Sequence, residues 1–183
     1  MGGAWSIIGI TWLAPVFGIY FAATLLASGQ GPTSAWRALA WAILAVIVII
    51  ALSYLGSVQH IERDFEGRLI YIWLVTAVAA LVAMRGWPAL FKVIAAYGYA
   101  ARIPVALVMY LAFRGNWATH YDALPPGMPP GYPFWEKYLL LGFLPQLVFW
   151  VAYTVVSGML LGGITAAVFR LIWLAPQKAP SGK

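Results

Sequence analysis

The sequence predicts an all-α, polytopic integral membrane protein with about five transmembrane helices. Hydrophobic residues make up 63% of the chain and charged residues only 9%, whereas a soluble domain has roughly 25% charged residues. The apolar residues form long runs, and a helix that crosses a bilayer needs about 20 of them. The net charge is +6, but the basic residues stand singly at the ends of these runs. Because nucleic-acid sites cluster their basic residues, nucleic-acid binding is not expected.

Five apolar stretches are the predicted membrane-spanning helices. Pro15 and Gly18 predict a kink within the first of them. Pro145 divides the last apolar run, which is too long for one simple crossing, into an interfacial or tilted segment at 134–144 and a final span. We therefore expect a single membrane domain over residues 1–175, with spans at 5–27, 38–56, 69–84, 88–113 and 146–173, an outer loop at 114–137 and a polar tail at 176–183.

The charges at the ends of the spans predict an orientation. All five acidic residues fall on the side of the N-terminus, together with four basic residues, whereas the opposite side carries six basic residues. Basic residues are enriched on the cytoplasmic side of membrane proteins. We expect the N-terminus outside and the C-terminus in the cytoplasm, in a bacterial inner membrane. The six basic residues of the predicted cytoplasmic side are Arg37, Arg85, Lys92, Arg170, Lys178 and Lys183.

Arg102 is a charged residue inside the predicted span 88–113. If the hydrocarbon begins near Ile94, Arg102 lies about 12 Å deep. Its long side chain either extends back to the membrane surface or faces a polar cavity or an anionic ligand, beside a helix loosened by Pro104. No carboxylate lies in any predicted span, so aromatic hydroxyls, freed carbonyls or a lipid phosphate are the expected partners. The candidate ligand- or lipid-binding residues are Arg102, Tyr97, Tyr99 and Lys92.

The two histidines and their acidic neighbours form a candidate metal or haem site. The predicted topology puts both histidines on the outer side, and imidazole with carboxylate suits zinc, manganese or iron. The spacing matches no metal-binding motif, which favours two solvated polar loops. Since the chain has no cysteine, thiolate metal sites and disulfides are excluded. The candidate metal-binding residues are His60, Glu62, Asp64, His120 and Asp122.

Small residues in the last span predict close helix packing. Gly158 and Gly162 form a G-x-x-x-G pattern, Ala166 continues the same face and Gly163 widens it. Small side chains let the backbones of membrane helices approach each other closely. The pattern does not specify the partner, which is either another subunit or another span of this chain.

The outer loop combines aromatic residues with a run of prolines. Prolines keep such a segment extended and stiff, so its aromatic side chains lose little entropy on binding a partner. The alternative is a cap that packs over the outer face of this protein itself. The candidate partner-docking residues are Trp117, Tyr121, Tyr132 and Trp135.

These features favour a non-catalytic membrane subunit or scaffold that packs with other subunits in a larger membrane complex. The sequence has no nucleophile elbow, Walker motif or H-E-x-x-H motif, so no enzymatic activity is predicted. The alternative is a small transporter or lipid-binding protein that uses Arg102 and the proline-kinked helices. A metal- or haem-bearing redox subunit is a third class. The expected partners are the lipid bilayer and other membrane proteins.

Overall fold

The computed structural model describes residues 11–59, 65–125, 128 and 131–174. All regular elements in these ranges are helices, which confirms the predicted all-α class. The elements in chain order are α2 (Leu13–Ala27), α3 (Ala35–Val58), α4 (Phe65–Met84), α5 (Pro88–Gly115), α6 (Phe134–Lys137), the π-helical segments η2 (Tyr138–Phe143) and η3 (Pro145–Phe149), and α7 (Trp150–Leu174).

Four helical stretches are long and apolar enough to cross a membrane, namely α3, α4, α5 and the continuous stretch that ends in α7. α4 begins at Phe65, four residues before the predicted 69, so the short third span of the prediction becomes a helix of 20 residues. The described part of the first predicted span, α2, has 15 residues. Residues 5–10 of that span lie outside the described ranges, so its membrane crossing stays a prediction.

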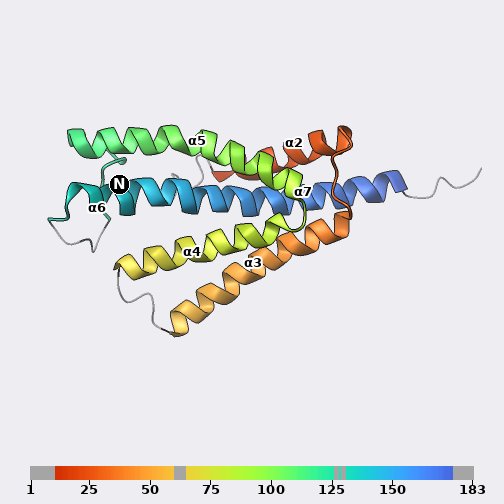
Figure 1. Cartoon of the computed structure of the whole chain (residues 1–183), viewed down its shortest axis with the longest axis horizontal. Coiled ribbons are helices and arrows are strands. Elements are labelled where there is room, and N and C mark those ends of the chain that lie inside the picture. Colours follow the sequence, from red (N-terminus) through yellow and green to blue (C-terminus); the bar gives the residue numbers. More distant parts are fainter. Residues whose placement is uncertain (1–10, 60–64, 126–127, 129–130, 175–183) are drawn as a thin grey trace, which may run out of the picture.

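The helices run side by side along the long axis of the molecule (Figure 1). The α2–α3 turn, the α4–α5 turn and the C-terminus of α7 lie at one end, which we call the turn end (Figure 1). The start of α4 and the segment between α5 and α6 lie at the opposite, loop end. At the turn end the indole N–H of Trp87 donates to the carbonyl of Gln30 at 3.0 Å, which joins the two turns. This arrangement agrees with the alternation of sides expected from the sequence.

α7 lies at the centre and packs against α2, α3, α4 and α5. A Cβ atom on Gly18 of α2 would lie 2.6 Å from the Cα atom of Gly158, so α2 and α7 touch backbone to backbone. A Cβ on Gly163 would lie 3.1 Å from the Cα of Leu39 in α3. A Cβ on Gly162 would clash with the side chain of Leu90 in α5. The small-residue face therefore packs inside this chain, which is one of the two alternatives left open by the sequence.

The helix from Phe134 to Leu174 continues through Pro145, where the sequence predicted a break. Proline cannot donate the backbone hydrogen bond of an α-helix, and its ring crowds the preceding turn. The π-helical segments on both sides of Leu144 widen the helix here and accommodate the ring without ending it. The result is one continuous helical stretch whose first third is irregular.

We predict that Gly18→Leu destabilises the isolated protein, because its side chain would enter the backbone of Gly158. Overpacking of this kind costs about 1–3 kcal/mol, and thermal unfolding in detergent measures it. Ala23→Leu, at an exposed position of the same helix, is the matched control and should leave the midpoint unchanged. An unchanged midpoint with an altered oligomeric state in Gly18→Leu would contradict packing within the chain.

Candidate functional site

Arg102 lies in the middle of α5, far from both helix ends. α5 starts with proline, a favourable residue for the first turn, and is capped at its C-terminus by Asn116, which adopts the left-handed conformation with φ of 47°. At 1.5 Å per residue, Arg102 is about 15 Å from Lys92 and about 18 Å from Arg114 along the helix axis. Arg102 is half-buried at this position, so its partners lie on the neighbouring helices.

The guanidinium of Arg102 contacts the last helical stretch instead of extending along α5. Its Nη1 donates a hydrogen bond to Oε1 of Gln146 at 3.3 Å, and its Cζ lies 4.8 Å from the ring centroid of Trp150. Gln146 is buried, and its Nε2 lies 3.5 Å from the sulfur of Met109, which orients the amide oxygen toward Arg102. An amide oxygen and an aromatic face therefore stabilise the charge.

The partners of Arg102 in the described structure are neutral. Helices α2, α3, α5 and α7 contain no Asp or Glu. The acidic residues within the described ranges are Glu66, Asp122 and Glu136, all at the loop end. Arg102 is half-buried and its described contacts are neutral, so its guanidinium can still bind an acidic group.

A small cavity of about 70 Å³ lies beside Arg102, between α2, α5 and α7. Tyr97, Tyr153 and Thr154 contribute to its walls. The ring of Tyr97 lies against Phe17 of α2, with centroids 4.5 Å apart. Small-molecule sites combine apolar walls with a few placed polar groups. This cavity has the same kind of lining, and its volume suits one small acidic group.

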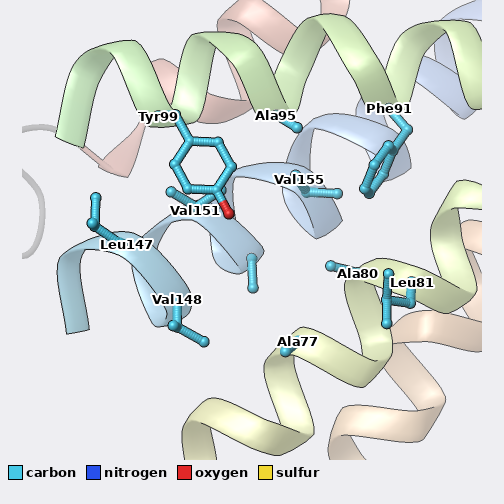
Figure 2. Close-up of a pocket in the computed structure, with 11 residues that line it drawn as sticks. Ala77, Ala80, Leu81, Phe91, Ala95, Tyr99, Leu147, Val148, Val151 and Val155 are labelled. Carbon is cyan, nitrogen blue, oxygen red and sulfur yellow. The ribbon is translucent and has the colours of Figure 1, made fainter. Parts of the chain in front are cut away.

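The structure separates the four residues proposed from the sequence as a ligand site. Tyr97 joins Arg102 at the small cavity, whereas Lys92 is exposed near the turn end. Tyr99 points into a different groove of about 210 Å³, between α4, α5 and the stretch formed by η3 and α7 (Figure 2). Apart from the Tyr99 hydroxyl, the side chains that line this groove are apolar, so it suits a hydrocarbon chain.

Gln146 and Trp150 are the site residues that the sequence analysis missed. Gln146 is the one amide side chain in the uncharged run from 138 to 169, and it directly follows Pro145. An isolated amide in an apolar span needs a polar partner, as does an arginine. The contact could therefore have been predicted from the sequence by treating Arg102 and Gln146 as partners.

The partner-docking residues of the loop divide into two groups. Trp117 and Trp135 are 50% and 60% exposed. Tyr132 donates its hydroxyl proton to the carboxylate of Glu66, which fastens the loop to the start of α4. Tyr121 lies against His120, with ring centroids 3.9 Å apart. The loop thus packs partly on the protein itself and presents two tryptophan side chains outward.

The structure leaves the metal hypothesis as a prediction. His60, Glu62 and Asp64 lie outside the described ranges, and the described residues contain no group of three potential metal ligands. The carboxylate of Asp122 accepts hydrogen bonds from the backbone N–H groups of Ala118 and Thr119, at 2.9 and 2.7 Å. Desolvation raises the pKa of Asp122, but these hydrogen bonds, together with those from the Thr119 hydroxyl and the backbone N–H of Asp122 itself, hold the pKa below its ordinary value. Within the described loop, Asp122 therefore organises the local backbone.

The chain matches no protein-family profile, no curated protein and no solved structure.

We predict that Gln146→Leu lowers the stability of the protein, because Arg102 would lose its hydrogen-bond acceptor inside the bundle. The loss of a hydrogen bond to a charged group costs about 1.5–3 kcal/mol, and thermal unfolding in detergent measures it. Gln146→Glu is the matched variant, since it keeps an acceptor and adds a counter-charge, and it should be at least as stable as the parent. Equal midpoints for the parent and Gln146→Leu would show that the contact contributes nothing.

Proposed function

We propose that this chain is a non-catalytic integral membrane protein that binds an acidic amphiphile at Arg102. The observation that carries the proposal is a cation in the middle of a long apolar helix, held by neutral partners beside a small cavity. Charged residues within membrane spans are costly and commonly mark ligand or ion sites. The non-catalytic assignment rests on the sequence, which has no recognised catalytic motif.

The chemistry of the site favours a carboxylate or a similarly compact acidic group. Arginine binds planar anions through two parallel hydrogen bonds, and its guanidinium keeps its charge inside proteins. A phospholipid in a bilayer keeps its phosphate at the surface, whereas Arg102 lies about 15 Å along the helix from the nearest flanking cation. A mobile acidic amphiphile that moves between the helices fits this depth better. Ligand binding without transport is the simplest form of the proposal.

The proposed membrane placement uses the four long apolar helices and adds the first predicted span as a fifth. We place the turn end in the cytoplasm of a bacterial cell, with the N-terminus outside. In support, Arg37, Arg85, Lys92 and Arg170 flank the turn end, and the acidic residues of the described part lie at the loop end. This distribution follows the preference of basic residues for the cytoplasmic side.

The second candidate function is that of a non-catalytic subunit in a larger membrane complex. The exposed side chains of Trp117 and Trp135 at the loop end favour it, because tryptophan is enriched among residues that dominate binding energy at interfaces. The small-residue face of α7 supports it less than the sequence suggested, since Gly158 and Gly163 already contact other helices of this chain.

We predict that the purified protein binds a 16-carbon fatty acid more tightly than the 16-carbon alcohol, because only the acid pairs with Arg102. Arg102→Gln should weaken binding of the acid about tenfold and leave binding of the alcohol unchanged, as expected for the loss of one charge-assisted contact. Equilibrium binding of radiolabelled ligands in detergent measures both affinities. Lys92→Gln, on the same helix near the turn end, is the matched control.

Equal affinities for the acid and the alcohol in the parent protein would overturn this proposal, as would an unchanged affinity in Arg102→Gln. Mass spectrometry of the gently extracted protein distinguishes the second candidate. Other membrane proteins that co-purify at fixed stoichiometry would favour a complex subunit, and a lone protein would count against it.

The absence of cysteine from the chain allows a direct test of the orientation. We predict that a thiol reagent that cannot cross membranes labels His120→Cys from the outside of intact cells, and that Gln30→Cys reacts only after the membrane is opened. Both positions are exposed, and they lie at opposite ends of the bundle. The reverse labelling pattern would invert the proposed topology, and labelling of both variants in intact cells would contradict membrane insertion.

A further inference from the structure

A second groove, separate from the Arg102 cavity, lies at the loop end between the start of α4 and the π-helical segments. Its volume is about 390 Å³. Arg68 is the charged side chain among the residues that line it, and Pro125 of the loop lies at its edge. The walls are otherwise apolar, and their main contributors are Leu69, Ile72, Trp73, Leu140, Leu141 and Phe149.

Arg68 is exposed, and its charge is not neutralised within the described part of the chain. Its contact there is with the ring of Phe65, whose centroid lies 5.8 Å from the guanidinium Cζ. The nearest carboxylate along the helix, that of Glu66, accepts a hydrogen bond from Tyr132. The groove therefore combines an apolar trough with an exposed cation at the loop end of the bundle.

The dimensions of the groove favour a single hydrocarbon chain. Its α4 wall extends from Phe65 to Trp73, which is about 12 Å of helix at 1.5 Å per residue. One leaflet of the hydrocarbon core is about 15 Å thick, half of the roughly 30 Å of the whole core. The length of the groove therefore matches that of an acyl chain within one leaflet.

We propose that this groove binds an anionic phospholipid, with its phosphate on Arg68 and one acyl chain along the trough. Arginine pairs well with phosphate, and the apolar walls make van der Waals contacts along the acyl chain. The position near the surface suits a phospholipid, in contrast to the deep position of Arg102. The inference rests on the membrane insertion proposed above, but it is independent of the ligand at Arg102.

The test measures retention of phosphatidylglycerol and phosphatidylcholine with identical acyl chains by the purified full-length protein in detergent. The parent protein should bind phosphatidylglycerol more tightly, and Arg68→Gln should weaken that binding about tenfold, to the level of phosphatidylcholine. Arg114→Gln is the matched control, because Arg114 lies at the same end, hydrogen-bonds to Tyr110 and does not line the groove. Native mass spectrometry counts the bound lipids.

Two further measurements test the acyl chain and the fold. Leu141→Trp should fill the trough and weaken binding of both phospholipids, and glycerol 3-phosphate, which has no chains, should not compete. Equal binding of phosphatidylglycerol by the parent and Arg68→Gln would overturn the proposal, as would an equal loss in Arg114→Gln or competition by glycerol 3-phosphate. Alkaline carbonate extraction of membranes tests membrane insertion separately, since an inserted protein stays in the pellet. A protein that stays in the pellet but fails the lipid tests would contradict the lipid site and leave the membrane insertion intact.

Discussion

The close approach of helices to α7 is the constraint on which the rest of the structure depends. Gly18 and Gly158 bring two backbones into direct contact, and Gly163 does the same against α3. In a membrane, where lipid removes most of the hydrophobic drive between helices, packing at this distance provides much of the association energy. Several helices hold α7 in place. Gln146, in η3 just before α7, and Trp150, the first residue of α7, are therefore fixed opposite α5.

The polar site follows from this packing. α5 runs antiparallel to α7, so Ile94 meets Gly158 near the turn end and Arg102 meets Gln146 farther along. An arginine on a lone membrane helix would extend its side chain to the surface, but here the guanidinium contacts the buried amide of Gln146 and the indole ring of Trp150. The π-helical geometry around Pro145 lies at the same level, and irregular turns of this kind frequently occur at functional sites.

The sequence predicted the helical class and most helix positions, because apolar runs bounded by polar turns give a strong signal. It predicted close packing at Gly158 but not the partner, since a small residue specifies distance and not identity. It singled out Arg102 but missed Gln146, because the two residues are far apart in the chain and only the register between helices joins them. It also grouped Tyr99 with Arg102, although the helix rotation directs Tyr99 into another groove (Figure 2).

The depth of Arg102 also has an electrical consequence. An inserted α5 would place this residue roughly halfway across the membrane, so an anion that reaches it from either surface crosses about half of the membrane voltage. Moving one elementary charge through the full voltage costs about 2.3 kcal/mol per 100 mV, and half of that is about 1 kcal/mol. The membrane voltage would therefore change the occupancy of the site. It would favour an anion that enters from one side of the membrane and oppose an anion that enters from the other.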